Sequence, residues 1–129
     1  MVYSFSCYGH ENITGTHKNT FEFTKEQSLN VEGDCILGVK ADFKLLKLKN
    51  YIKNKDKIKI IIKVDDLVEE IICNVNHDFN SFEEIVVRKT EFNSRRTLGV
   101  RANKACVDLN RELVKKLSEP GKEYTVVIE

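Results

Sequence analysis

The chain has 129 residues, of which 41% are hydrophobic, and its 21 Lys and Arg residues nearly balance its 20 Asp and Glu residues, for a formal net charge of +1 at pH 7. This length fits one globular domain, residues 1–129, and excludes a large multidomain enzyme. The balanced charge, the single Pro and the lack of low-complexity tracts exclude a disordered chain, a collagenous repeat and a coiled coil.

The first half of the chain predicts a strand at residues 2–8, a hairpin at 12–16 and 21–24, a turn at Gly33 and Asp34, a strand at 35–41, a helix at 43–54 and a strand at 57–64. The helix is indicated by Leu45, Leu48 and Ile52, which recur at helical spacing. Asp42 precedes it and is predicted to cap its free amides.

The second half predicts strands at 67–75, 84–89 and 97–102, a second helix and a closing strand at 124–128. Asn103 is predicted to cap this helix, and Pro120-Gly121 to end it. About eight strands and two helices indicate an α+β, β-dominated fold with a curved, mainly antiparallel sheet or a barrel-like core.

The two halves resemble each other, which predicts an internal duplication. Ile36-Leu37-Gly38-Val39-Lys40-Ala41-Asp42 recurs as Thr97-Leu98-Gly99-Val100-Arg101-Ala102-Asn103. His17 and His77 each precede a turn, and each half then follows the same order of elements. We therefore divide the domain into pseudo-repeats at residues 11–64 and 67–129.

Four segments of the chain carry a family resemblance: Gly9 to His17, Thr20 to Thr24, Gly33 to Val39 and Arg96 to Ala105. Together they resemble the archaeal domain-of-unknown-function family 371 over nearly the whole chain. The resemblance implies an archaeal source and a stand-alone domain. It implies no function and supplies no catalytic residue.

Residues with acid-base or metal-binding side chains gather in the N-terminal half: His10, Asn12, His17, Glu22, Asp34 and Cys35. One hypothesis is a small hydrolase or lyase in which His10 acts with Glu22 or Asp34, at a homodimer interface where two chains complete one cleft. The alternative is that His10 is a hydrogen-bonded structural residue, and that His17 is structural because His77 repeats it.

The cysteines Cys7, Cys35, Cys73 and Cys106 form no Cys-x-x-Cys pair, so we expect reduced, mostly buried thiols and neither a metal site nor a cofactor. The longest apolar runs, such as Ile60 to Ile62, are too short to cross a bilayer, and residues 1–5 lack the pattern of a secretory signal. We therefore expect a cytoplasmic protein that is not inserted in a membrane.

Charge is segregated along the chain. Nine lysines lie between residues 40 and 63, an acidic stretch follows to residue 84, and a second basic stretch spans 88–104. The basic and acidic stretches could pair with one another on the surface, or the basic ones could bind a polyanion. Within the second basic stretch, Arg95, Arg96, Arg101 and Lys104 stand near the predicted start of a helix, where free amides favour anions.

The sequence has no glycine-rich phosphate loop, nucleophile elbow, paired-histidine zinc motif or aromatic RNA-binding signature. Our first hypothesis is therefore a binding protein for a phosphate-bearing ligand, either RNA or a nucleotide-like small molecule, held by Arg95, Arg96, Arg101 and Lys104.

Overall fold

The computed structural model describes residues 1–29 and 34–129, so the turn expected at Gly33 lies outside the described residues. Its elements, in chain order, are β1 (Tyr3–Tyr8), β2 (Thr20–Thr24), β3 (Ile36–Gly38), α1 (Leu45–Ile52), β4 (Lys57–Val64), β5 (Leu67–Val75), β6 (Glu84–Arg88), β7 (Thr97–Val100), a short 3-10 helix (Cys106–Asp108), α2 (Arg111–Leu117) and β8 (Glu123–Ile128). The expected β-dominated α+β fold is confirmed.

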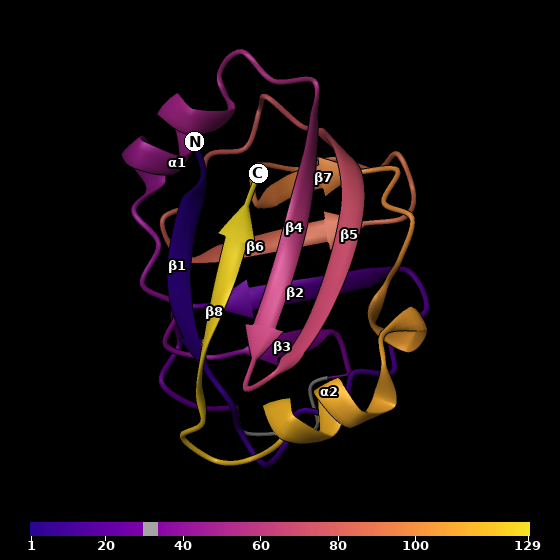
Figure 1. Ribbon diagram of the computed structural model, residues 1–129. Coiled ribbons are helices and arrows are strands. Elements are labelled where there is room, and N and C mark those ends of the chain that lie inside the picture. The colour runs from indigo at the N-terminus through magenta and orange to yellow at the C-terminus, as the bar shows by residue number, and fades with distance from the viewer. Residues whose placement is uncertain (30–33) are drawn as a thin grey trace.

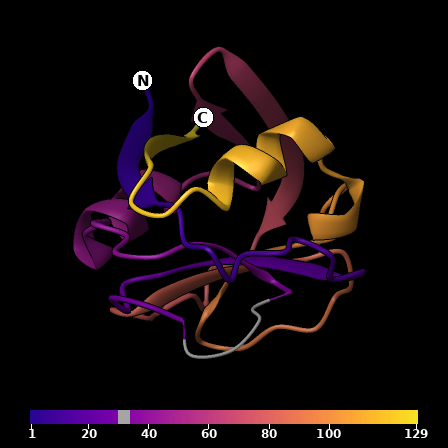
Figure 2. The ribbon, with the colours of Figure 1, turned by 90° about the horizontal axis from the view of Figure 1, so that it is seen from below.

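The strands form one sheet in the order β1-β8-β4-β5-β7-β6-β2-β3. Figure 1 shows the sheet bent into two layers: β1, β8, β4 and β5 stand roughly upright in front, in alternating directions, while β7, β6, β2 and β3 cross behind them. The two helices lie at opposite corners, α1 at the upper left and α2 at the lower right. Figure 2, seen from below, shows α2 lying across the lower end of the molecule, between the two layers and the viewer.

The sheet is mainly antiparallel, as expected, but it contains two parallel pairs, β2–β3 and β6–β7, and each has a register shift. In the described part of the chain, the end strand β1 is joined to the residue after β3 by an isolated antiparallel bridge between Tyr8 and Val39, with no further ladder between β1 and β3. The sheet is therefore curved rather than closed into a barrel by a continuous ladder. None of the described helices is long and apolar enough to span a membrane.

The core fills the space between the two layers and is built around aromatic side chains. Phe5 contacts both Phe23 and Phe43 edge to face, with ring centroids 5.6 and 5.8 Å apart, and Phe21 contacts Phe23 in the same way at 5.8 Å. Such pairs add to the free energy gained from burial alone. They join β1, β2 and the segment before α1 into one packed unit.

The back layer turns into the front layer at two corners, one after β3 and one after β7. At both, a non-glycine residue adopts a left-handed φ of 53°, Lys40 at one and Arg101 at the other. At both, a side chain two residues later accepts a hydrogen bond from the front-layer backbone: Asp42 from the Ser6 amide at 2.7 Å, and Asn103 from the Ile72 amide at 3.0 Å.

Two local predictions for the first half of the chain were wrong. Asp42 does not cap α1, because its carboxylate already binds the Ser6 amide; Lys44 holds the N-cap position without a side-chain cap. Residues 12–16 form no strand, so the predicted hairpin is absent there and only β2 is realised.

The second helix begins later than predicted. Asn103 is already bound to the Ile72 backbone, and α2 starts only after Asn110, whose side chain accepts from the amides of Glu112 and Leu113 at 2.8 and 3.2 Å. The intervening residues form the short 3-10 helix, whose start is held by Asp108 accepting from the Ala105 amide at 2.9 Å.

Each corner also requires a glycine in close contact with a cysteine. A Cβ at Gly38 would overlap the Tyr124 hydroxyl and lie 2.7 Å from the Cys7 sulfur, and a Cβ at Gly99 would overlap the Cys73 sulfur. Such overpacking forces neighbours out of their preferred positions. A side chain is therefore excluded at Gly38 by Tyr124 together with Cys7, and at Gly99 by the Cys73 thiol.

We expect Gly99→Ala to lower the free energy of unfolding by roughly 2 kcal/mol. Because the overlap is with a single sulfur, the same substitution should cost at least about 1 kcal/mol less in a Cys73→Ala background. Urea unfolding of the four variants measures this coupling. In a Cys7→Ala background, which alters the other corner, Gly99→Ala should keep its full cost; equal costs in both backgrounds would contradict the assignment.

Candidate functional site

The basic residues singled out near the second helix do not converge on one point. Three of them pair with three separate carboxylates: Arg96 with Glu84 at 3.0 Å, Arg101 with Glu91 at 2.5 Å, and Lys104 with Glu69 at 2.5 Å. Arg95 is exposed. Three of these four residues are thus paired with the protein's own acidic groups, as the first of the two alternatives left open by the sequence expects.

The start of α2 already has an anion, which is Glu69 of β5. This carboxylate is only 9% exposed; one oxygen binds Lys104, and the other accepts from the Asn110 amide at 2.7 Å. The negative charge that was expected from a bound phosphate is supplied by the chain itself. Arg96, Arg101 and Lys104 thus pair with three different carboxylates, and a phosphate site formed by them stays a prediction.

His10 forms part of a turn. Its Nδ1 accepts from the Asn12 amide at 3.0 Å, and its Nε2 lies 3.3 Å from the Leu29 amide. A corresponding turn occurs in the second half, where the Asn76 side-chain oxygen accepts from the Asp78 amide at 3.2 Å. Among the described residues of the single chain no hydrogen bond joins His10 to Glu22 or Asp34.

His17 is also a turn residue. Its Nδ1 accepts from the amides of Asn19 and Thr20 at 3.0 and 3.1 Å. A turn of the same kind occurs before β6, where the Ser81 hydroxyl accepts from the amides of Glu83 and Glu84, each at 3.2 Å. His77, which the sequence comparison set beside His17, is exposed.

The structure brings together two residues that the sequence placed in rival hypotheses, Glu22 and Arg96. Glu22 lies on β2 and is 7% exposed, and Glu84 on the neighbouring β6 hydrogen-bonds both Glu22 and Arg96. Arg88, also on β6, binds the Thr97 hydroxyl at 3.0 Å. Together Glu22, Glu84, Arg88 and Arg96 form a polar cluster across the back layer.

Burial raises the pKa of Glu22 to about 8, and its hydrogen bond and charge repulsion with Glu84 act in the same direction. Burial alone would raise the pKa of Glu84 too, but hydrogen bonds from Glu22 and Arg96 outweigh it and hold this pKa below its usual value. At neutral pH, Glu22 is thus a protonated donor to an ionised Glu84. Such a pair can transfer a proton, but here the proton donor and the proton acceptor are both side chains of the protein.

The cysteines do not provide a nucleophile. Burial raises the pKa of Cys7, Cys73 and Cys106 to about 12. Burial, with the nearby carboxylates of Glu22 and Asp34, raises the pKa of Cys35 to about 11. The reactive form is the thiolate, so all four remain thiols at neutral pH. All four are free cysteines, and Cys35 is the one that is not fully buried.

The lysines of the first basic stretch behave differently from the arginines. Within residues 1–29 and 34–129, no ion pair is formed by the lysines around α1, namely Lys44, Lys47, Lys49, Lys53, Lys55 and Lys57. Asp56 is the only acidic residue from 44 to 57. The buried face of α1 is formed by Leu45, Leu48 and Ile52, so its lysines project to the surface.

Two hollows flank this helix and share Lys47. One, of about 330 Å³, is lined by Lys25, Lys44, Leu45, Leu46, Lys47 and Phe82. The other, of about 370 Å³, is lined by Met1, Val2, Tyr3, Lys47, Asn50, Tyr51 and Lys55. We call these residues the α1 surface. Sequence reasoning noted its lysines but missed Phe82, Tyr3 and Tyr51, which come from other segments or from the opposite side of the helix.

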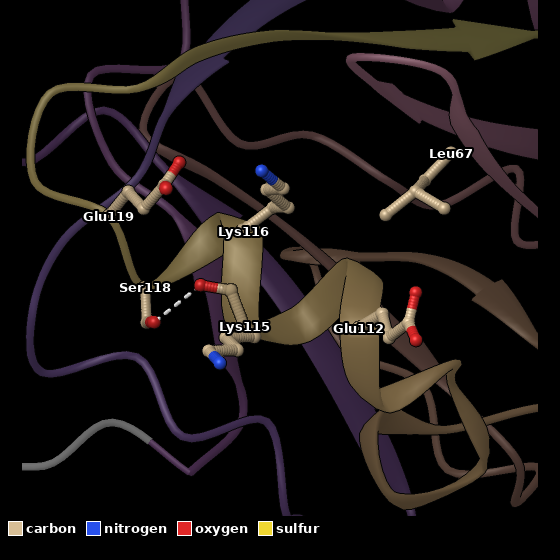
Figure 3. A pocket seen from close by; sticks show the side chains of 6 residues that line it. All are labelled: Leu67, Glu112, Lys115, Lys116, Ser118 and Glu119. Carbon is tan, nitrogen blue, oxygen red and sulfur yellow. Dashed lines mark hydrogen bonds between the residues drawn. The ribbon is translucent and has the colours of Figure 1, made fainter.

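A third hollow, of about 420 Å³, lies beside α2 and is lined by Leu67, Glu112, Lys115, Lys116, Ser118 and Glu119. Figure 3 shows the two lysines pointing to opposite sides of the helix and the two glutamates at either end of the groove. Lys116 approaches Asp65 at 3.6 Å. The mixed charge of this groove does not favour a phosphate group.

These features define a small two-layered α+β protein with an internally neutralised arginine region and one basic surface. The chain belongs to the DUF371 family, a domain of unknown function, whose family model matches residues 5–129. A relative, the uncharacterized protein MJ0206 of Methanocaldococcus jannaschii, is 39% identical over 129 residues, covering 95% of each chain. The family assignment made from the sequence is confirmed.

The raised pKa of Glu22 predicts a pH-dependent stability. The folded state holds a proton that the unfolded state releases above its ordinary pKa of about 4.5, so the contribution of this group to stability is lost as pH rises from there to about 8. Glu22→Gln mimics the protonated form. It should match the wild type near pH 5 and exceed its free energy of unfolding by roughly 2–4 kcal/mol near pH 9.

Urea unfolding across this pH range provides the measurement. Glu70→Gln, which alters an exposed carboxylate paired with Lys59 at 3.7 Å, is the control and should leave the pH dependence unchanged. Parallel curves for the wild type and Glu22→Gln would show that Glu22 ionises normally in the folded protein.

Proposed function

We propose that this protein binds a phosphate-bearing ligand, RNA or a nucleotide-like molecule, through the lysines of the α1 surface. The observation that carries the proposal is the uneven neutralisation of positive charge. Arg96, Arg101 and Lys104 each have a carboxylate partner, whereas the lysines around α1 have none among the described residues. A surface whose positive charge is not balanced attracts polyanions at long range.

The second basic stretch is the other candidate for the same function. Arg96 and Arg101 are half-exposed or more in spite of their ion pairs, with exposed side-chain fractions of 50% and 59%, and Arg95 is exposed. A phosphate group would have to compete with Glu84 and Glu91 there. The α1 lysines have no such competitor, so we rank their surface first.

A hydrolase or lyase is the rival function, and one observation favours it: Glu22 carries a proton beside an ionised Glu84. The expected partners do not support it, since His10 binds backbone amides and the Asp34 side chain is exposed. Glu22 itself is buried against protein groups. The binding proposal is therefore the stronger of the two.

To test binding, we expect matched triple variants to separate the two basic regions. Lys44→Gln/Lys47→Gln/Lys49→Gln should weaken binding to RNA or to inorganic polyphosphate and lower the slope of log K against log salt by about 2, since each contact with a single-stranded polyanion contributes roughly 0.7. Arg95→Gln/Arg96→Gln/Arg101→Gln removes the same charge and should change the slope by less. Equal effects of both triples would show that only net charge matters, and the reverse order would assign the site to the arginines.

We also propose that the two halves of the domain are copies of one unit, the first beginning at β1 rather than at residue 11. Recurrent backbone hydrogen bonds support this. The Ala41 amide binds the Thr24 carbonyl and the Ala102 amide binds the Arg88 carbonyl, at 2.9 and 3.0 Å. The amides of Gly9 and Val75 bind equivalent carbonyls just before β8 and β4, each at 2.8 Å.

The strand partners support the same correspondence. β1 pairs with β8 as β5 pairs with β4, and both β3 and β7 pair in parallel with the preceding strand. In Figure 1, a half turn in the plane of the picture would carry α1 to the position of α2 and β1 to that of β5.

If the halves are equivalent units, their order in the chain is interchangeable. Tyr3 pairs with Ile128, so a short linker can join the termini, and the chain can be opened between Asp65 and Asp66 in the β4–β5 turn. This circular permutant should fold, with a melting midpoint within about 5 °C of the wild type. A permutant opened between Asn54 and Lys55 divides one unit and should be clearly less stable. Equal stability of the two, or failure of the first to fold, would contradict the proposal.

A further inference from the structure

We infer that the α1 surface binds single-stranded RNA, with bases stacked on Phe82 and Tyr51 and phosphates held by the surrounding lysines. The inference rests on the proposed function and specifies its ligand. It is drawn from the way in which aromatic and basic side chains alternate around the two hollows beside α1. Single-stranded nucleic acids are bound by this combination, because every base has a face that can stack on an aromatic ring.

Phe82 is the strongest indication. Its side chain is 66% exposed, although it stands between the turn residue Ser81 and the buried strand β6. The lysines Lys25, Lys44 and Lys47 line the same hollow, with Leu45 and Leu46. A large exposed aromatic ring surrounded by positive charge fits a ligand that has both flat apolar faces and negative groups. Nucleotides have both.

Lys49 extends the positive charge along this side. Its amino group donates to the Asn80 side chain at 3.4 Å, which places it close to the loop that carries Phe82. Of the lysines near Phe82, Lys25 also lies 4.4 Å from the centre of the Phe43 ring. These contacts hold the amino groups of Lys49 and Lys25 near the exposed ring of Phe82, and neither contact neutralises their positive charge.

The second hollow repeats this chemistry on the other side of Lys47. Tyr51 lies at its wall, with the Lys55 amino group 4.8 Å from the centre of its ring and the Tyr3 ring 6.5 Å away. Lys47 lines both hollows, so it is well placed to contact the phosphate between two bases, one in each hollow.

The need for stacked bases favours single-stranded RNA over a duplex. In a duplex the base faces are covered by neighbouring bases, whereas loops and ends of RNA present them unpaired. A duplex would contact the lysines but leave the exposed ring of Phe82 without a stacking partner. Stacking on aromatic residues therefore distinguishes single-stranded RNA, the inferred ligand, from a polyanion that contacts only the lysines.

Fluorescence anisotropy with a labelled oligouridine of roughly 12 nucleotides provides the test. Phe82→Ala should weaken binding about 5-fold or more, as is typical of a lost base stack. The matched control is Phe92→Ala, which removes a ring that is 63% exposed but packs beside Arg88, 4.8 Å from its centre, away from α1. This control should bind as the wild type does.

A second pair of variants tests the phosphate contact. Lys47→Gln should lower the slope of log K against log salt by about 0.7, the contribution of one phosphate in a single strand. Lys115→Gln, on the exposed side of α2, removes the same charge outside the α1 surface and should leave the slope unchanged. Circular dichroism melting of all four variants checks that they fold.

The outcomes distinguish this inference from the function on which it rests. If duplex RNA and inorganic polyphosphate bind as tightly as the oligouridine and Phe82→Ala has no effect, the inference fails while polyanion binding stands. If none of these ligands binds, both fail. Tighter binding to the matching DNA strand, or binding to anionic vesicles in place of the oligouridine, would also overturn the RNA assignment.

Discussion

The fold depends on the two corners at which the back layer turns into the front layer. After each of the parallel-paired strands β3 and β7, the chain passes from the back layer to the front layer within a few residues. It does so through a left-handed residue followed by a polar side chain that binds the front-layer backbone. A glycine before the corner lets the strand approach a cysteine of the front layer. These contacts fix the crossing of the layers and hence the space that the aromatic core fills.

The corners also determine what Asp42 and Asn103 can do, and this explains much of what the sequence could and could not predict. Most of the strands and the apolar face of α1 follow from local periodicity and were predicted, although residues 12–16 form no strand and β3 is shorter than expected. A capping residue is recognised by its position before a helical pattern, but Asp42 occupies that position while serving a contact 36 residues away. Likewise, nothing near Glu69 in the sequence indicates that it neutralises Lys104 and the start of α2.

The candidate site was predictable only in part, for the same reason. Charge segregation along the chain was visible, but whether a basic residue is neutralised depends on which strands become neighbours. Pairing of β6 with β2 brings Glu84 between Glu22 and Arg96, and thus joins residues from two separate hypotheses. Phe82 gave no signal in the sequence, because a phenylalanine next to a strand is normally buried.

A comparison of the two helices indicates that the charge of α1 is not required by the fold. α1 and α2 pack through equivalent apolar faces, Leu45, Leu48 and Ile52 in one and Leu113, Val114 and Leu117 in the other. α2 carries Glu112 as well as lysines, and its Lys116 approaches an aspartate. The same structural role is therefore fulfilled with balanced charge. Lys44 at the N-cap stands three residues before Lys47, and Lys49 stands four residues before Lys53 at the C-cap, spacings at which like charges repel each other. A ligand that neutralises these lysines would remove that repulsion.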